Sequence, residues 1–411
     1  MSRSLRRENE SEPRQPRTMK QETQVAIIGA GPAGLTLALL LNEAGIHATV
    51  LESRSREYVE SRARAGLLEQ NTVDLFNELR VAQRLNRLGL QHRGVYLSFN
   101  GERCRVPFDE LTNGRTITIY GQQEVIRDLI AACIERHIPI EFGADVADAN
   151  GIDSKKPQVV YRQGEHEHNL GCEFIAGCDG YHGISRKFLP KGSYREFVKE
   201  YPFSWLGILA HAAPATDELI YAYHENGFAL HSLRSDAVSR LYLQVDNSDR
   251  VENWPDEKVW DELDIRLSDK NGFHVNRGEI FEKGITPMRS FMVDSMQHGR
   301  LFLAGDASHI VPPTGGKGLN LAVADVRWLA AALEKWYANS DDSALQTYTS
   351  DCLRRIWRAQ EFSNFMTYLF HKQSPHGSFD YHMQKSRFDY IRQSKAQAAI
   401  IAENYVGLKY I

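Results

Sequence analysis

Residues 24–34 read QVAIIGAGPAG, and this stretch decides the fold. The apolar run Gln24–Ile28 predicts a buried strand, and Pro32–Ala44 predicts an almost wholly apolar helix. Between them the spacing G-x-G-x-x-G is met by Gly29, Gly31 and Gly34. Glycine at these places permits a tight turn, the close approach of a pyrophosphate, and tight packing of the helix on the sheet. The stretch therefore predicts the phosphate-binding turn of a dinucleotide fold.

A second strand is predicted at Ala48–Leu51, and it ends at Glu52. The acid then stands where a carboxylate is expected to accept hydrogen bonds from ribose hydroxyls, which completes a βαβ unit of Rossmann type. The alternative is a glycine-rich turn in a generic α/β fold. No second fingerprint of this kind follows, so an enzyme that needs two nucleotides must bind the other one transiently.

Composition excludes several classes of protein. The 411 residues suffice for two or three packed units, and the formal net charge of -4 offers no basic surface for nucleic acid. The five cysteines form no C-x-x-C pair, which predicts reduced thiols, a cytoplasmic protein and no metal site. The longest apolar stretch, Val25–Leu41, is interrupted by glycine and proline, so no membrane span is expected.

Residues 1–19 are rich in Arg, Glu, Ser and Pro and nearly free of apolar side chains. Such a segment cannot offset its ordering entropy, so it is expected to be a disordered extension. It also lacks the apolar core of a secretion signal. The sequence leaves open whether Met19 is the natural start.

Two further segments follow apolar strands downstream. Residues 178–186 read CDGYHGISR, and residues 300–307 read RLFLAGDA. The second leads into VPPTGGKGLN at 311–320, which precedes a helix predicted over 321–336. Each segment alone is compatible with an ordinary turn, because Asp-Gly and Gly-Asp are common turn dipeptides.

In this order, GAGPAG, CDG and the GD segment resemble the motifs of the single-component FAD-dependent aromatic hydroxylases. The likeness covers nearly everything after residue 20, including YPF at 201–203, FAL at 228–230 and AENYVGL at 402–408. It implies a flavoprotein monooxygenase that uses FAD, O₂ and a nicotinamide, with NADPH favoured over NADH. The implied reaction converts 4-hydroxybenzoate to 3,4-dihydroxybenzoate through a C4a-hydroperoxyflavin.

The resemblance implies a mixed α/β fold in three parts. A Rossmann-like FAD-binding domain is expected over 20–195 and completed by 290–320, followed by an antiparallel-sheet substrate domain over 196–289. A helical interface region is expected over 321–411. The PPTGGKG segment then lies at a helix N-terminus, whose positive end suits the anionic side of a reduced flavin. The alternative for that segment is a loop shaped by packing.

Short strands are predicted from 201 to 245, in the manner of an antiparallel sheet. In SRLYLQV at 239–245, alternation places Arg240, Tyr242 and Gln244 on one face. From this pattern alone, a face open to solvent is the preferred interpretation, because antiparallel sheets often keep one wet side.

The resemblance favours a substrate face instead. It implies that three residues hold the substrate carboxylate: Ser232, Arg234 and Tyr242. A guanidinium fork matches a carboxylate in two parallel bonds, which suits this role. Arg240 is implied to lie beside the flavin and Tyr221 beside the substrate phenol. The carbonyl of Pro313 and the side chain of Thr314 are implied to line the ring.

A proton chain is implied as well. Tyr221 is expected to take the proton of the substrate phenol and relay it through Tyr405 to His92, because a phenolate attacks electrophilic oxygen far better than a phenol. Such a chain moves a proton out of a dry pocket without admitting water. The alternative for His92 is an ordinary surface histidine.

The remaining contacts implied by the resemblance concern the two nucleotides. Those expected at FAD are Gly29, Gly31, Gly34, Glu52, Arg64, Gln122, Asp179, Arg240, Asp306, Leu319 and Asn320. Those expected at the nicotinamide nucleotide are Arg54, Tyr58, Arg62, Arg64, His182 and Arg289, with Arg56 as a further candidate. An arginine common in the family after the acid is here Ser53, which weakens the preference for NADPH. Each nicotinamide candidate has an ordinary surface role as its alternative.

Three alternatives stay open. The substrate is either 4-hydroxybenzoate or a related benzoate such as 4-aminobenzoate or 3,4-dihydroxybenzoate. A scaffold that keeps the fold without flavin is the non-enzymatic alternative, whereas a halogenase is disfavoured because no WxWxIP segment occurs. A homodimer is implied, and the contact would come from an aromatic-rich helix, although core packing explains this stripe equally well: Phe362, Phe365, Tyr368 and Phe370.

Overall fold

The computed structural model describes residues 21–62 and 66–407, so the expected extension over 1–19 and Arg64 lie outside the described residues. A six-stranded sheet in the order β19-β20-β13-β2-β3-β9 forms its base. The parallel strands are β2 (Val25–Ile28), β3 (Ala48–Glu52), β9 (Ile140–Phe142), β13 (Phe174–Gly177) and β20 (Leu301–Leu303). An antiparallel edge is added by β19 (Gln297–His298). The predicted strand, helix and strand over residues 24–52 are confirmed.

The two faces of this sheet are covered by different layers. On one face, Val25 and Ile27 pack against α1 (Pro32–Glu43), α6 (Gln122–Glu135) and α8 (Gly318–Asn339). On the other face, Ala26 and Ile28 pack against a four-stranded sheet in the order β1-β12-β11-β10. Because both faces are buried, the strands carry apolar residues without alternation.

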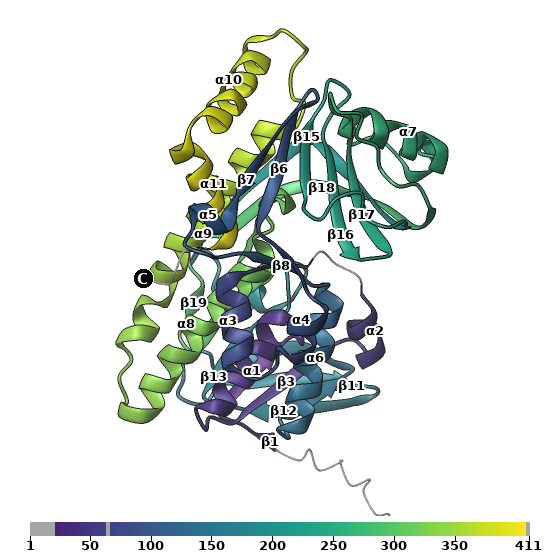
Figure 1. The fold of residues 1–411 in the computed structure, drawn as a ribbon. Helices are drawn as coiled ribbons and strands as arrows, with labels where there is room; N and C mark the ends of the chain where they lie inside the picture. The colour runs from purple at the N-terminus through teal and green to yellow at the C-terminus, as the bar shows by residue number, and fades with distance from the viewer. Residues whose placement is uncertain (1–20, 63–65, 408–411) are drawn as a thin grey trace, which may run out of the picture.

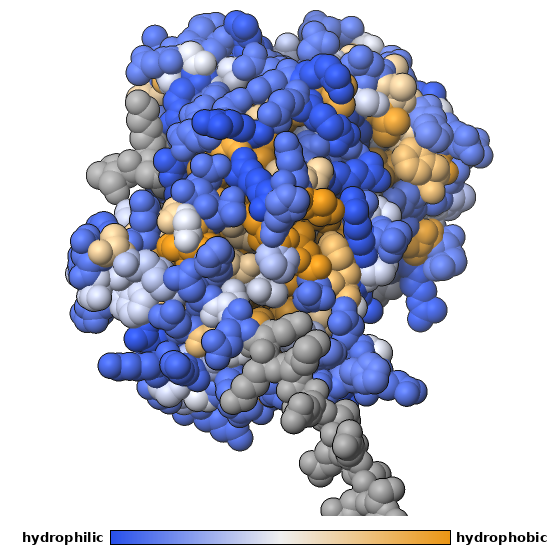
Figure 2. All heavy atoms as spheres, turned by 90° about the horizontal axis from the view of Figure 1, so that it is seen from below, coloured by the Kyte–Doolittle hydropathy of each residue, from blue (hydrophilic) through white to orange (hydrophobic). Residues whose placement is uncertain are grey.

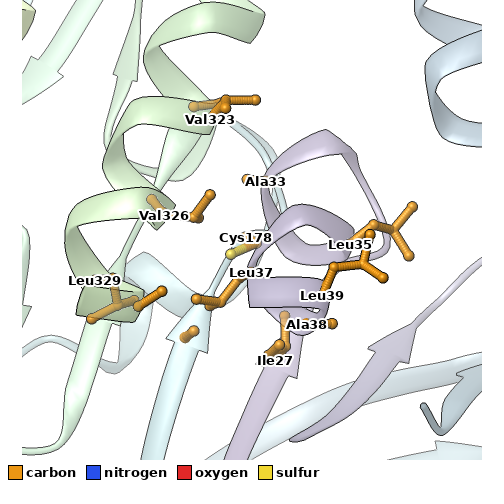
Figure 3. Packing of buried hydrophobic residues seen from close by; sticks show 14 of the residues in the cluster. Ile27, Ala33, Leu35, Leu37, Ala38, Leu39, Cys178, Val323, Val326 and Leu329 are labelled. Carbon is orange, nitrogen blue, oxygen red and sulfur yellow. The ribbon is translucent and has the colours of Figure 1, made fainter. Parts of the chain in front are cut away.

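The contact between α1 and α8 is the centre of the helical layer. Figure 3 shows Val326 and Leu329 of α8 pointing toward Leu37 of α1 and toward Cys178, which follows β13. These side chains are almost completely buried. Burying such aliphatic side chains stabilises the fold by roughly 1.5–3 kcal/mol each. This packing therefore fixes the position of α1 relative to α8.

The second large unit is an eight-stranded sheet in the order β21-β18-β14-β17-β16-β15-β6-β7. Its strands are β6 (Gly94–Phe99), β7 (Glu102–Pro107), β14 (Glu196–His211), β15 (Ile220–Tyr223), β16 (Ala229–Ser235), β17 (Val238–Val245), β18 (Glu279–Val293) and β21 (His309–Ile310). It therefore extends beyond the expected range 196–289, because β6 pairs in parallel with β15. One face of this sheet packs on α7 (Asp256–Leu267).

Three C-terminal helices follow α8, and they are α9 (Ser343–Phe370), α10 (Phe379–Gln393) and α11 (Lys395–Val406). The shorter helices are α2 (Arg56–Ser61), α3 (Gln70–Glu78), α4 (Gln83–Leu88) and α5 (Phe108–Leu111). A small sheet in the order β4-β8-β5 joins Leu67–Glu69, Ile117–Ile119 and Leu90–His92. The four-stranded sheet comprises β1 (Gln21–Glu22), β10 (Ala144–Asn150), β11 (Gln158–Gln163) and β12 (His166–Gly171).

Figure 1 shows the eight-stranded sheet above the six-stranded one, with α7 at one side of the upper unit and α10 and α11 at the other. Seen from below, the surface is mostly hydrophilic, with apolar atoms gathered near its middle (Figure 2). Within the described part of the chain, no helix has the length and apolar character needed to cross a bilayer.

We expect Gly34→Ala to lower the free energy of unfolding by about 1–3 kcal/mol, the usual cost of overpacking. A Cβ there would overlap the carbonyl oxygen of Gly29, so α1 would have to move away from the turn. The matched control is Gly284→Ala, because a Cβ at this exposed position in β18 meets no atom within 4 Å. Denaturant unfolding of both variants measures the difference, and equal stabilities would contradict the packing argument.

Candidate active site

The glycine turn after β2 leaves open space at one of its three glycines. A Cβ at Gly29, where φ is +106°, would lie 2.5 Å from the carbonyl oxygen of Cys178. At Gly31, by contrast, a Cβ would meet no atom within 4 Å. Gly31 is the N-cap of α1, so the open space lies at a helix N-terminus, where free N–H groups attract phosphate. The turn therefore fits the diphosphate of a dinucleotide.

Glu52 is held beside this turn. Its carboxylate accepts hydrogen bonds from the backbone N–H of Ala30 at 2.8 Å and from that of Arg54 at 2.9 Å. The carboxylate is thus fixed at the end of β3 in the half-buried position that a ribose contact requires.

The three sequence motifs meet at one edge of the lower sheet. The strands β2, β13 and β20 are neighbours and parallel, so the segments that follow them lie side by side. After β13, the Asp179 carboxylate accepts from the N–H and the hydroxyl of Ser185, at 2.8 and 3.0 Å. Its other oxygen is buried and has no hydrogen-bond partner in the part of the chain that the structure describes, and burial raises the pKa of this carboxyl. One acceptor of Asp179 is therefore left for a ligand.

The turn after β20 receives the N-terminal turns of two helices. A Cβ at Gly305, where φ is +64°, would lie 3.0 Å from the Cβ of Ala322 in α8 and 3.6 Å from the Cβ of Ala33 in α1. The positive ends of both helix dipoles therefore point at the same region. A Cβ at Gly318, the first residue of α8, meets no atom within 4 Å, which leaves this helix end open as well. Half-buried Asp306 and Leu319 flank the region.

Sequence reasoning missed the ion pair that holds the GD turn. The Asp325 carboxylate in α8 accepts from the N–H of Gly305 at 2.9 Å and lies 2.6 Å from Nε2 of His309. Burial would lower the pKa of His309, but the charge of Asp325 outweighs it and raises the pKa above its usual value. An acid about two turns into α8, at Asp325, with a histidine after the GD motif, was the available signal. The sequence alone does not predict that this acid contacts the histidine, because only the fold brings α8 beside the GD turn.

The side-chain amide of Asn320 makes all of its hydrogen bonds to other residues of the protein. Its oxygen accepts from the N–H of Glu69 and the hydroxyl of Thr72, and its nitrogen donates to the carbonyls of Leu67 and Gly316. An amide can make four such bonds, so none is left for a cofactor. Only the backbone of Asn320 is available for the contact expected from the sequence.

The register of the upper sheet brings the predicted substrate residues onto one face. Tyr221 pairs with Leu230, Leu230 pairs with Tyr242, and Ser232 pairs with Arg240. Directly opposed residues share a face, whereas the alternate residues Leu241 and Leu243 are buried against α7. The alternation predicted for 239–245 is therefore confirmed, and the polar face is the one turned away from α7.

Two neighbouring arginines on this face, Arg234 and Arg240, favour the binding of an anion. Burial and the charge of Arg240 together lower the pKa of Arg234 to about 10. Two buried nitrogens of Arg240, Nε and Nη1, have no hydrogen-bond partner among the described residues, and its guanidinium lies 5.2 Å from the Tyr242 ring centroid. Buried donors without an acceptor are costly, so a carboxylate or another anionic group fits here.

The tyrosine hydroxyls lie near the PPTG segment, at η4 (Pro313–Gly315). The Tyr221 hydroxyl donates to the carbonyl of Thr314 at 3.0 Å, and the Tyr405 hydroxyl approaches the same oxygen at 3.4 Å. Burial raises the pKa of both tyrosines well above the usual value. Pro313, in contrast, is exposed. The structure therefore brings Tyr221, Tyr405 and Thr314 together.

His92 is not a surface residue, because only 1% of it is exposed. Both of its ring nitrogens lack a partner among the described residues, and burial lowers its pKa to about 4. The carbonyl of the next residue, Arg93, accepts the N–H of Phe108, and the Phe108 ring stacks on Tyr405 at 5.2 Å. No hydrogen bond between His92 and Tyr405 is present in the described part, so a proton would need a water molecule to pass.

The candidates for the nicotinamide nucleotide form two separate groups. His182 and Arg289 both contact Tyr181, at 4.9 Å between rings and 5.1 Å from guanidinium to ring. Arg54 lies 5.5 Å from the ring of Tyr58. Arg62, a further nicotinamide candidate, is exposed directly after α2. Gln122, which is expected at FAD, is half-buried at the start of α6.

A second buried ion cluster was also missed from sequence. The Lys317 ammonium donates to Glu69 at 2.7 Å and to the carbonyl of Asn404, and Arg355 donates to the other Glu69 oxygen at 2.9 Å. Burial alone would raise the pKa of Glu69, but the charges of Lys317 and Arg355 hold it below its usual value. The cluster ties the start of α8 to α9 and α11, so it fixes the segment that carries Thr314.

The chain matches the model of the FAD binding domain family over residues 22–363. It is 44% identical over 393 residues to a p-hydroxybenzoate hydroxylase of Acinetobacter baylyi, and the match covers 96% of each chain. Its fold is similar to that of p-nitrophenol 4-monooxygenase from Pseudomonas putida DLL-E4, with a TM-score of 0.83 and 17% identity over 95% of this chain and 100% of that one. It is also similar to aklavinone-11 hydroxylase, solved with FAD and aklavinone, with a TM-score of 0.72 and 19% identity over 88% and 72% of the chains.

We expect Lys317→Met to lower the free energy of unfolding by about 3–5 kcal/mol, because it leaves the buried Glu69 carboxylate with one cation fewer. The double variant Lys317→Met/Glu69→Leu should recover at least half of that loss, since no uncompensated acid remains. Denaturant unfolding of the single and double variants measures the coupling. Strictly additive losses would show that the pair contributes nothing.

Proposed function

Because the chain belongs to the FAD binding domain family, within its flavin-dependent aromatic monooxygenases, we propose that it hydroxylates 4-hydroxybenzoate beside the phenol to give 3,4-dihydroxybenzoate. The observation that carries this substrate is the shared face of the upper sheet. There, a pair of half-buried arginines lies on the same side as a buried tyrosine whose hydroxyl donates to the PPTG segment. The face thus offers one end for an acid and another for a phenol.

The acid end is the pair of neighbouring strands β16 and β17. Arg234 presents its fork to the substrate carboxylate, with Ser232 and Tyr242 as further donors. A carboxylate between the two guanidiniums would relieve their mutual repulsion and give Arg240 an acceptor for its buried N–H groups. A ring without a carboxylate would neither relieve this repulsion nor give Arg240 an acceptor, so the site favours benzoates over simple phenols.

The phenol end is formed by Tyr221, with Pro313 and Thr314 along the ring. Tyr221 accepts the proton of the substrate phenol and releases its own toward Tyr405. The proton then reaches His92 through water, because a gap separates these two side chains. With a pKa of about 4, His92 is neutral at pH 7 and is able to accept a proton, but it holds the proton weakly and passes it on.

FAD is the cofactor, and in its reduced form it supplies the activated oxygen atom that is added to the ring. The residues that fit it are the open turn at Gly31, the ribose acid Glu52, and the region shared by Asp179, Asp306 and the start of α8. Further contacts are proposed for Gly29, Gly34, Arg64, Gln122, Arg240, Leu319 and Asn320. Helix dipoles from α1 and α8 favour negative charge on the diphosphate and on the reduced ring.

NADPH is the proposed reductant, in preference to NADH. An arginine fork suits the 2'-phosphate, and the exposed α2 segment supplies Arg54 and Arg56 beside Tyr58. The nicotinamide end is assigned to Arg62, Arg64, His182 and Arg289. His182 and Arg289 already meet at the ring of Tyr181, which supports a common role.

The chain is further proposed to act as a cytoplasmic homodimer. Its five cysteines are free thiols, as expected in a reducing compartment. An apolar stripe on α10 consists of Phe379, Met383 and Tyr390, which are 79%, 48% and 54% exposed and lie within one helical face. The stripe on α9 contributes less, because Phe362 and Phe370 are core residues. Molar mass in solution tests the dimer.

The function is tested by following NADPH and NADH consumption by the FAD-loaded enzyme against a panel of benzoates, with products identified. We expect 4-hydroxybenzoate to give 3,4-dihydroxybenzoate with the highest coupling and NADPH to be used faster. Faster, coupled turnover of 4-aminobenzoate or 3,4-dihydroxybenzoate would replace the substrate assignment. A protein that binds no FAD would refute the enzyme altogether.

Arg234→Ala should raise the dissociation constant of 4-hydroxybenzoate roughly 100-fold, about 3 kcal/mol, since the carboxylate then loses its buried partner. Binding is measured through the change in flavin absorbance. Ser235→Ala, at the exposed end of the same strand, is the matched control and should bind like the parent enzyme. Unchanged affinity in Arg234→Ala would remove the arginine from the acid site.

Tyr221→Phe should still bind 4-hydroxybenzoate but should release most reducing equivalents as hydrogen peroxide, because the phenol keeps its proton. The ratio of product to NADPH consumed measures this coupling. Tyr223→Phe removes a hydroxyl two residues along the same strand, from a ring stacked on Phe99 at 4.1 Å, and should stay coupled. Full coupling in Tyr221→Phe would exclude the relay.

A further inference from the structure

One backbone carbonyl lies at the junction of the proton chain. The oxygen of Thr314 accepts the Tyr221 hydroxyl at 3.0 Å and has the Tyr405 hydroxyl at 3.4 Å. A tyrosine hydroxyl carries one hydrogen, so Tyr221 cannot donate to this carbonyl and to a bound substrate at the same time. The carbonyl and the substrate oxygen therefore compete for the same hydrogen.

The side chain of Thr314 is tied to the last turns of α9. Its hydroxyl lies 2.8 Å from that of Thr367, and the Thr367 hydroxyl donates to the carbonyl of Ser363 at 2.7 Å. Since the single hydrogen of Thr367 is used in that bond, the Thr314 hydroxyl is the donor between the two threonines. Both residues are completely buried, so this bond is shielded from water.

A neutral histidine fixes this turn of α9 against the upper sheet. His371 Nδ1 lies 2.8 Å from the carbonyl of Thr367, and Nε2 lies 2.6 Å from the indole nitrogen of Trp205. A carbonyl only accepts and an indole only donates, so Nδ1 carries the proton and Nε2 is bare. The ring stacks between Phe203 and Phe228, at 4.4 and 4.3 Å. Burial lowers the pKa of His371 to about 3, which keeps it neutral.

We propose that the Thr314 carbonyl is the resting acceptor of the Tyr221 hydrogen, that Thr367 and His371 hold this carbonyl in place, and that Tyr221 must turn its hydrogen away from the carbonyl, toward Tyr405, before it can take the proton of a bound phenol. Thr367 and His371 are thus positioning residues for the proton chain. The inference rests on the proposed hydroxylation of a phenol. It adds a determinant of when that phenol ionises.

The sign of the effect follows from the competition. A firmly placed carbonyl withdraws the Tyr221 hydrogen from the substrate oxygen and repels a negative charge on it, so both effects favour the neutral phenol. Loosening the carbonyl should therefore favour the phenolate. Two other ionisable groups face Tyr221 and Tyr405. Tyr242 from β17 faces Tyr221, and the Lys317 ammonium lies 5.9 Å from the Tyr405 ring centroid. A substitution in α9 leaves Lys317 unchanged.

The test replaces Thr367 by valine, which keeps the shape and removes the hydroxyl, and by serine, which keeps the hydroxyl. The absorbance of 4-hydroxybenzoate bound to the FAD-loaded enzyme is titrated with pH to give the apparent pKa of the bound phenol. In Thr367→Val we expect this pKa to fall by about half a unit, a roughly threefold change in ionisation constant. The change is small because the substitution weakens one hydrogen bond without removing it. Thr367→Ser should match the parent enzyme.

An unchanged or raised phenol pKa in Thr367→Val would overturn the proposal, and so would an equal fall in Thr367→Ser. Failure of the parent enzyme to bind 4-hydroxybenzoate would instead refute the proposed function. The positioning claim is then decided without substrate, by a double-mutant cycle of Tyr221→Phe and Thr367→Val on the melting temperature. Coupled losses support a shared carbonyl, whereas additive losses exclude it.

Discussion

The N-terminal turns of α1 and α8 meet at Gly305, and the positions of both ligand regions follow from that contact. Glycine suits the GD turn here, because φ of Gly305 is +64° and a Cβ would lie only 3.0 Å from the Cβ of Ala322. The Asp325 carboxylate then holds the turn through the Gly305 N–H and His309. Because α8 begins directly after the PPTGGKG segment, the same contact that orients the helix dipoles also places Thr314 against the upper sheet.

Buried charge is distributed unequally in this molecule. Lys317, His309 and Arg266 each have a carboxylate within 2.8 Å, and these pairs join segments distant in sequence or stabilise one helix. Arg240, on the polar face of the upper sheet, is different, because its buried Nε and Nη1 have no acceptor among the described residues, and burial together with the charge of Arg240 lowers the pKa of Arg234. Desolvated cations gain most from an anion that arrives with a ligand, and this is the physical basis of the acid site that we propose on this face.

The phenol end depends on hydrogen direction more than on charge. Tyr221, Tyr405, Thr314, Thr367 and His371 are all buried, and each hydroxyl or ring nitrogen has a defined donor or acceptor. In such a network a single hydrogen has one destination at a time. In the relay that we propose, ionisation of a bound phenol therefore depends on which oxygen accepts the Tyr221 hydrogen, and the Thr314 carbonyl is one of the acceptors.

The amino-acid sequence by itself determined the βαβ unit, the dinucleotide turn and the alternation in 239–245, because these depend on neighbouring residues and on periods that the chain shows directly. Through a family resemblance it also gave expected roles in substrate or FAD binding to Tyr221, Arg234 and Asp306. Only the tertiary structure decided that β6 and β7 join the upper sheet, that His92 is buried, and that the Asn320 amide is already used. It likewise decided the pairs Glu69–Lys317 and Thr314–Thr367, which are 248 and 53 residues apart. Such contacts have no local signature, since they form only when packing brings distant elements together and removes water from between them.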